Sequence, residues 1–197
     1  MRYFTRSVGT IVFLGLLSLV VSFGIGQPNR QQADTKVTKS TLRRIYDEDQ
    51  QNRNDMEGDA RRRTQVRQLI ADDKVQTGED YYYAAFIFQH GQKPEDYLYS
   101  HVLAMTALKM GFAPARWLSA ASLDRYLRSV KQPQIFGTQF GSLFDDRDDQ
   151  EPYNKELLSD KMREMFCVAS YARQQKILED TRSGKEFTST RTCPIPE

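Results

Sequence analysis

The first 26 residues differ from the rest of the chain in their hydrophobic pattern. Arg2 and Arg6 precede residues 8–25, a stretch that is apolar apart from small polar residues and that ends in a Gly-Ile-Gly sequence. A short positive segment, an apolar run and small residues at its end are typical of a secretory signal peptide. The run is also close to the roughly 20 residues that span a bilayer, so a retained N-terminal membrane anchor is the alternative. Both interpretations predict that the protein is exported, to the periplasm or the extracellular space.

Two amphipathic helices are predicted in the next part of the chain. Residues 27–39 contain a single large hydrophobe, Val37, and we expect a flexible linker because so little apolar surface cannot offset the cost of ordering. A first helix is predicted to begin at Ser40 or Thr41, either of which can cap it. A second is expected at about residues 59–72, where a few hydrophobic residues form a narrow stripe. The folded domain therefore starts near residue 40.

The hydrophobic positions are densest in residues 81–88, which are apolar or aromatic without a break. A run of this length can form a buried strand. Two local signals favour a buried helix instead: Thr77 with Asp80 three residues later can cap its start, and Gly91 follows its end. We therefore predict that this segment is a helix in the centre of the fold.

Two further helices follow with short connections. Pro94 is suited to the first turn of one helix, which we expect to end at Met110 because a glycine comes next, and another helix covers residues 114–130. Small residues recur along all three of these helices, so neighbouring helices can pack closely. They are Ala84, Ala85, Ala104, Ala107, Ala115, Ala120 and Ala121. The pattern predicts stacked helical hairpins.

Beyond residue 140 the pattern is weaker. An acidic stretch at residues 145–151 is predicted to be a solvated loop, because it lacks the central glycine and closing glutamate of a helix–loop–helix calcium site. Helical character resumes near Asn154 and again at about residues 172–181, which leaves residues 185–197 as a C-terminal tail. We predict an all-α fold of about six helices in one domain, residues 40–184, arranged as a partial solenoid or a compact helical bundle.

A repeat-like pattern lies between Tyr83 and Leu127. It consists of Ala84-Ala85, Gly91, Pro94-Glu95-Asp96-Tyr97, Ala104, Ala107, Gly111, Ala115 and Leu118. These residues resemble the short Sel-type branch of the tetratricopeptide repeats. The resemblance covers about one and a half repeats, whereas three or more are normally needed for a free-standing solenoid. It implies a tetratricopeptide-like scaffold that binds other proteins.

A second set of motifs covers more of the chain. It comprises Ile45-Tyr46 with Asp49-Gln50 and Arg53, then Phe88-Gln89-His90-Gly91, then Asp124-Arg125-Tyr126-Leu127, and Gln134 with Phe136-Gly137-Thr138-Gln139. This set resembles a bacterial family of exported helical domains of unknown function. The resemblance implies the fold and the compartment, and it implies no activity.

Charge and cysteine content narrow the possible classes of protein. The chain has 28 Lys and Arg against 26 Asp and Glu, and Arg2 and Arg6 account for the difference, so the mature protein is formally neutral. Its composition therefore gives no indication of nucleic-acid binding. The chain has two cysteines, Cys167 and Cys193. In an oxidising compartment we expect them to form a disulfide that joins the tail to the last helical region; two unpaired thiols are the alternative.

Five polar residues form the candidate site: His90, His101, Asp124, Arg125 and Gln139. Asp124 lies on the apolar stripe of its predicted helix, where a carboxylate needs a partner because burial without one costs several kcal/mol. An Asp–His pair in a helical groove could act as a general base. The same groups could instead form a satisfied buried network that holds the loop 134–139 onto the helices. The structural interpretation is favoured because no nucleophile motif accompanies the cluster.

The sequence thus predicts binding rather than catalysis. No cofactor motif is present, and the two histidines lack the short spacing that is typical of a zinc site. We expect a protein or peptide to bind in the groove of the helical hairpins. A hydrolase that uses an Asp–His pair is the alternative function. Contact with a membrane is expected only through residues 8–25, if the signal segment is retained.

Overall fold

The computed structural model describes residues 30–52, 55–141 and 150–195. The predicted signal peptide and most of the acidic loop lie outside these ranges. Within them the chain forms seven α-helices and two isolated β-bridges but no β-strand, so the predicted all-α class is confirmed. The helices are α1 (Arg30–Gln51), α2 (Met56–Ala71), α3 (Gly78–Gln89), α4 (Pro94–Lys109), α5 (Ala115–Ser129), α6 (Asp160–Met165) and α7 (Tyr171–Arg182). No helix of the described part is long and apolar enough to cross a membrane.

The first helix is longer than the sequence predicted. α1 begins at Arg30, so residues 30–39 are helical rather than a flexible linker. The reason is that neither glycine nor proline occurs between Arg30 and Gln51. Once the second half of the helix is held by packing, adding further turns costs little, because nucleation rather than propagation is the expensive step.

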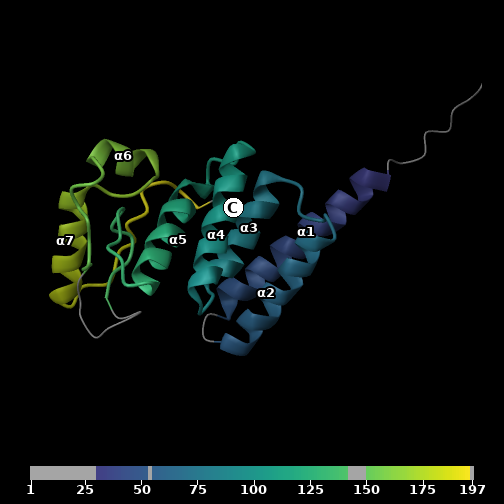
Figure 1. The fold of residues 1–197 in the computed structure, drawn as a ribbon, viewed down its shortest axis with the longest axis horizontal. Helices are drawn as coiled ribbons and strands as arrows, with labels where there is room; N and C mark the ends of the chain where they lie inside the picture. The colour runs from purple at the N-terminus through teal and green to yellow at the C-terminus, as the bar shows by residue number, and fades with distance from the viewer. Residues whose placement is uncertain (1–29, 53–54, 142–149, 196–197) are drawn as a thin grey trace, which may run out of the picture.

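Helix α3 forms the centre of the molecule (Figure 1). Its predicted capping box is present: Thr77 Oγ1 accepts a hydrogen bond from Asp80 N at 3.1 Å, and Asp80 Oδ2 accepts one from Thr77 N at 2.9 Å. Every residue from Tyr82 to Gln89 is buried. A helix that is apolar on all sides is stable only when neighbours surround it. Here α1 and α2 lie on one side of α3, and α4 lies on the other.

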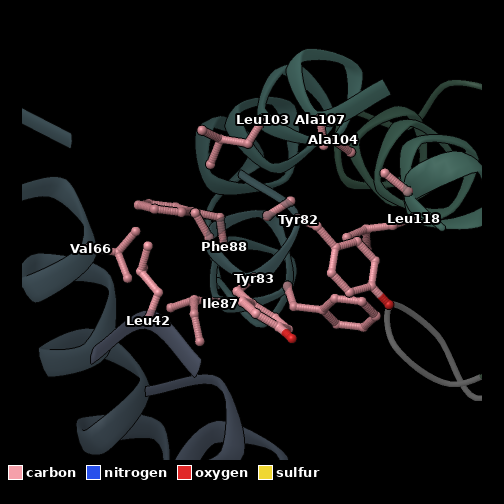
Figure 2. Packing of buried hydrophobic residues seen from close by; sticks show 14 of the residues in the cluster. Leu42, Val66, Tyr82, Tyr83, Ile87, Phe88, Leu103, Ala104, Ala107 and Leu118 are labelled. Carbon is pink, nitrogen blue, oxygen red and sulfur yellow. The ribbon is translucent and has the colours of Figure 1, made fainter. Parts of the chain in front are cut away.

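The core between these helices depends on small residues. Ala84, Ala85, Ala104 and Ala107 are completely buried, and Ser100 Oγ donates to the carbonyl of Ala85 at 2.7 Å across the α3–α4 contact. Figure 2 shows side chains from four neighbouring helices around α3. They are Leu42 of α1, Val66 of α2, Leu103 of α4 and Leu118 of α5. The most extensive contacts are those of α3 with α4 and of α4 with α5, as expected for stacked hairpins, whereas α1 packs more on α3 than on α2.

The region after α5 differs from the prediction in one respect. Helix α6 begins at Asp160, not near Asn154. The backbone at residue 154 is engaged elsewhere: Asn154 N donates to Gln134 O, and Gln134 N donates to Pro152 O, both at 2.9 Å. Ser159 then caps the short helix by accepting from Met162 N. Pairing with the loop that follows α5 therefore delays the helix.

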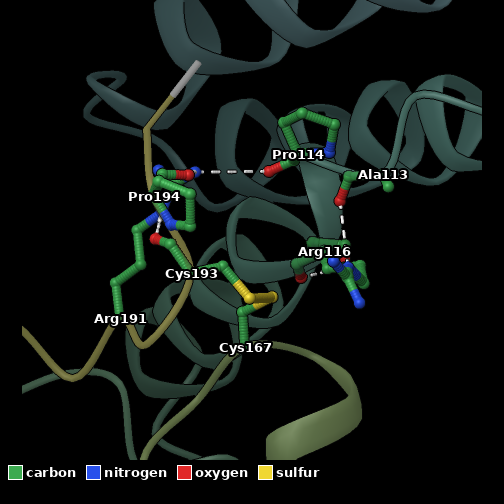
Figure 3. Close-up of a disulfide and its surroundings, with 8 residues drawn as sticks. Ala113, Pro114, Arg116, Cys167, Arg191, Cys193 and Pro194 are labelled. Carbon is green, nitrogen blue, oxygen red and sulfur yellow. Dashed lines mark hydrogen bonds between the residues drawn. A yellow bond between two sulfur atoms is a disulfide. The ribbon is translucent and has the colours of Figure 1, made fainter.

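The C-terminal residues 185–195, here called the strap, return from α7 toward the middle of the molecule (Figure 1). The predicted disulfide between Cys167 and Cys193 is present, with Cα atoms 5.3 Å apart (Figure 3). Backbone hydrogen bonds support it: Ala169 N donates to Thr190 O, and Thr192 N donates to Cys167 O. Arg191 Nη2 also reaches Pro114 O at 3.5 Å. These contacts hold the strap against the helices.

Candidate functional site

Asp124 organises the loop that follows α5. Its side chain is fully buried and accepts four hydrogen bonds from that loop. The donors are Ile135 N at 2.8 Å, Phe136 N at 3.0 Å, Thr138 N at 2.9 Å and Thr138 Oγ1 at 2.8 Å. Burial raises the pKa of Asp124, and the four hydrogen bonds act in the opposite direction. The contacts are those of a structural carboxylate that fixes a loop.

Four buried glutamines extend this network: Gln134, Gln139, Gln150 and Gln174. Gln134 Nε2 donates to Gln139 O, and Gln139 N donates back to Gln134 Oε1, both at 3.0 Å. Gln150 Nε2 donates to Gly137 O at 2.7 Å, and Gln174 Nε2 donates to Phe136 O at 2.9 Å. An amide can donate and accept at once, so these side chains satisfy loop groups that no helix or sheet pairs. The loop is therefore rigidly held.

Arg125 joins this loop to the end of α3. Its Nε donates to Gln139 Oε1 at 3.1 Å, and its Nη1 donates to Gln89 O at 2.8 Å. Its guanidinium also lies 5.8 Å from the ring centre of Tyr97. Three of the five predicted residues, Asp124, Arg125 and Gln139, are thus brought together on one side of α5.

The two histidines lie elsewhere. His90 Nδ1 is 2.6 Å from Asp49 Oδ2, in a group of charged side chains from α1 and α2 that includes the ion pair of Arg62 and Asp59. His101 Nδ1 is 2.8 Å from Ser119 O, between α4 and α5. The four donors to Asp124 come from its loop, so the structure does not pair Asp124 with a histidine. The Asp–His contact that forms is His90 with Asp49.

A pocket of about 400 Å³ opens beside the Asp124 network. Helix α5 supplies one wall, the loop after it the floor, and α7 with the strap the opposite wall. The lining residues are Trp117, Arg125, Thr138, Gln139, Phe140, Gly141, Leu178, Thr181, Phe187, Ser189 and Thr190. This volume lies within the range of small-molecule and peptide-anchor sites. The predicted residues Arg125 and Gln139 therefore have solvent-accessible space next to them.

The pocket combines apolar walls with hydrogen-bonding groups. Phe140 and Phe187 meet edge to face, with ring centres 5.4 Å apart, and Leu178 adds aliphatic surface. Phe187 is 50% exposed, so the pocket opens to solvent at the strap. Arg125 is the one charged side chain among the described lining residues. That surface can hold an apolar group and a negatively charged or hydrogen-bond-accepting group side by side.

Two polar atoms of the pocket residues have no hydrogen-bond partner in the described structure: Trp117 Nε1 and Thr190 Oγ1. Thr190 is only 2% exposed. A buried polar group without a partner costs about 1–3 kcal/mol. The indole nitrogen can only donate, and a hydroxyl can donate or accept. A bound acceptor group would relieve part of this cost.

The residues that line the pocket are poorly suited to acid–base catalysis. None of those described is His, Cys, Asp, Glu or Lys. Across the described ranges, no group of three or more His, Cys, Asp or Glu side chains is placed to hold a metal ion. The lining can recognise a ligand by shape, charge and hydrogen bonding.

Two of the five residues predicted from the sequence, Arg125 and Gln139, line this pocket, and none of its apolar wall residues was predicted. Both were predicted as members of a polar cluster around the buried Asp124. Phe187 and Thr190 come from a segment without hydrophobic periodicity, and only the disulfide indicated that this segment returns to the helices. No protein-family model matches the chain, and no curated protein or solved structure is significantly similar to it.

Proposed function

We propose that this protein is an exported binding protein that holds part of a peptide or protein partner in the pocket between α5, α7 and the strap. The observation that carries the proposal is the pocket itself, in which aromatic walls meet a polar floor that lacks acid–base residues among those described. Its size, mixed lining and opening to solvent suit recognition.

The construction of the pocket supports binding with little rearrangement. Asp124 and the buried glutamines hold the loop of the floor, and the Cys167–Cys193 disulfide holds the strap. A site whose walls are already ordered loses less conformational entropy when a ligand binds. A rigid polar network next to a partly exposed aromatic wall therefore favours affinity.

Export and a repeat-like scaffold belong to the same proposal. A disulfide suits an oxidising compartment, and the chain begins with a segment typical of secretory signals. The consecutive packing of α3, α4 and α5 is consistent with tetratricopeptide-like hairpins. Mass spectrometry of the protein recovered from the expressing cell would show whether the chain begins after residue 26. A chain that retains residues 1–26 would support the anchored alternative.

The binding proposal can be tested by selection from a random heptapeptide library displayed with free C-termini. The protein is compared with Phe187→Ser, which removes a pocket wall, and with Met165→Ser, a matched control. Met165 is an apolar side chain of α6 that is 62% exposed and is not among the pocket residues. Peptides enriched by the wild type should bind the control equally well and bind Phe187→Ser at least fivefold more weakly. The proposal is wrong if no peptide is enriched, or if enriched peptides bind all three proteins alike.

A hydrolase that uses His90 and Asp49 is the second candidate, favoured by their 2.6 Å contact. An imidazole oriented by a carboxylate can act as a general base toward water. The contact lies among other charged groups, including Arg62 at 3.5 Å from Asp49 Oδ1, and this surrounding favours a structural ion network. Assays with casein and p-nitrophenyl acetate would decide. Hydrolysis that is lost in His90→Gln would support the enzyme, and the absence of hydrolysis would support binding alone.

A further inference from the structure

We infer that the outward face of α4 is an interface at which two copies of this chain pair in antiparallel orientation about a two-fold axis. This inference goes beyond the proposed binding function, because none of the described residues that line the pocket belongs to α4. It follows from three features of α4: the alignment of its exposed apolar residues, the charges beyond the two ends of that alignment, and the symmetry of their spacing.

Exposed apolar residues form one stripe along α4, which packs between α3 and α5 (Figure 1). The stripe consists of Leu98, Val102 and Met105, which are between 40% and 49% exposed. Steps of four and three residues place them on one side of the helix, opposite its buried residues. Single exposed hydrophobic residues are common, but a continuous row of them indicates an interaction surface. The same spacing occurs in the seam between two paired helices.

A charged residue follows the stripe at each end of the helix. Glu95 lies in the first turn of α4 and Lys109 in its last turn, and both residues are exposed. Glu95 precedes Leu98 by three residues and Lys109 follows Met105 by four, so both charges lie on the side of the stripe. Within the described ranges neither side chain forms a hydrogen bond or an ion pair. This face of α4 is therefore acidic at one end, apolar in the middle and basic at the other end.

The spacing makes this face complementary to itself. Val102 is separated by seven residues, or about 10.5 Å along the helix axis, from Glu95 and equally from Lys109. When a second copy is related to the first by a two-fold axis at Val102, each Glu95 lies opposite the partner's Lys109. Each Leu98 then lies beside the partner's Met105. A two-fold interface requires a surface that matches itself in this way, whereas parallel helices would bring like charges together. The charges therefore favour an antiparallel second copy as the occupant.

The length of this face indicates a weak dimer. From Glu95 to Lys109 the helix rises by about 21 Å. A single helix of this length offers less area than the roughly 800 Å² that each partner buries in a standard interface. We therefore expect a dissociation constant in the micromolar to millimolar range, with monomers prevailing in dilute solution.

Sedimentation equilibrium of the protein purified from the expressing cell, over about 1 µM to about 1 mM, measures this association. The wild type should pass from monomer to dimer within the range. Val102→Glu places two carboxylates at the two-fold axis and should weaken dimerisation by about tenfold or more. Met162→Glu is the matched control, because Met162 is 46% exposed but lies on α6, and it should dimerise as the wild type does. A wild type that stays monomeric, or a Val102→Glu variant that still dimerises normally, would overturn the inference.

Reversal of the charges tests the antiparallel orientation and leaves the apolar residues intact. Glu95→Lys and Lys109→Glu each create two pairs of like charges across the axis. At low ionic strength each variant alone should therefore dimerise about fivefold to tenfold more weakly than the wild type. When the two variants are mixed, every pair is again of opposite charge, so they should form heterodimers with about the affinity of the wild type.

The double variant with both reversals separates pairing from effects on the helix itself. It restores opposite charges across the axis and should dimerise like the wild type. Its charges oppose the helix dipole at both ends of α4, so an effect through the stability of the helix would make it the weakest dimer of all. A double variant that dimerises more weakly than either single variant would show that the two copies do not pair in this orientation.

The pocket and the α4 interface are tested independently. Peptide selection with Phe187→Ser reports on the pocket, and sedimentation of the α4 variants reports on the interface. A protein that selects peptides but remains monomeric would refute only the dimer. A protein that dimerises through α4 but selects no peptide would refute only the binding function.

Discussion

Replacing Asp124 tests the network on which the pocket is built. In Asp124→Ala the loop loses the acceptor of four hydrogen bonds, three of them from backbone N–H groups. The Thr138 hydroxyl can rotate toward another partner, but the backbone donors cannot. Each buried donor left unpaired costs about 1–3 kcal/mol, so a total loss of about 3–5 kcal/mol is expected if water partly replaces the carboxylate. That loss is a large fraction of the stability of a domain of this size.

The loss can be measured by thermal and urea unfolding, followed by circular dichroism. For a domain of 150–250 residues, 1 kcal/mol corresponds to about 2–4 °C in Tm, so Asp124→Ala should lower Tm by roughly 6–20 °C. Glu164→Ala is the control, because Glu164 is an exposed carboxylate on α6. It should change stability by no more than about 0.5 kcal/mol. If Asp124→Ala lowers stability by less than about 1 kcal/mol, the loop does not depend on this carboxylate and the reasoning is refuted.

The pH dependence of stability tests whether burial or hydrogen bonding has the larger effect on the pKa of Asp124. Burial raises the pKa of Asp124 in the folded protein above its ordinary value of 3.8. The folded state then holds this proton more tightly than the unfolded state. The resulting contribution to stability is fully present below pH 3.8 and is lost as the pH rises through the raised pKa. Asp124→Asn cannot titrate, so the stability of the wild type relative to this variant should fall over that window. A difference that grows with pH would show that the hydrogen bonds outweigh burial.

Three further predictions concern the disulfide, a close contact and a buried tyrosine. The Cys167–Cys193 disulfide closes a loop with a sequence separation of 26, so its reduction should lower the free energy of unfolding by about 3–4 kcal/mol in calorimetry; an unchanged Tm would contradict this. Gly91→Ala would place a Cβ 2.2 Å from Asp96 Cβ, so the free energy of unfolding measured with urea should fall by about 1–3 kcal/mol. An unaltered urea midpoint would mean that the α3–α4 turn can move to accommodate the methyl group. Burial raises the pKa of Tyr82 to about 12, so ultraviolet titration should show one late-ionising tyrosine that is absent in Tyr82→Phe. The stability of the folded protein should fall as the pH rises from 10 through 12. Ionisation of every tyrosine near pH 10 would refute the assignment.

Local sequence signals were sufficient where a helix end depends on neighbouring residues. Thr77 and Asp80 form the predicted capping box, and Pro94 begins α4 as expected. The disulfide could be predicted because the chain contains only two cysteines. A buried partner for Asp124 could also be anticipated, since a carboxylate on an apolar stripe cannot remain unpaired.

Local signals failed where distant segments compete for the same groups. The predicted start of α1 was wrong because capping residues inside a helix resemble those at its end. The start of α6 was wrong because residues 152–154 pair with Gln134. Both errors involve residues whose local propensity allows two structures, and only packing selects one of them.

The sequence by itself determined the all-α class, the central helices and the disulfide, because helix periodicity, caps and cysteine number are properties of short segments or of composition. Only the tertiary structure decided that His90 contacts Asp49, that His101 contacts Ser119 and that Asp124 holds a loop. It alone placed the strap opposite Arg125 and so created the pocket. Such contacts join residues far apart in the chain, and their selection depends on burial and hydrogen bonding summed over the whole fold.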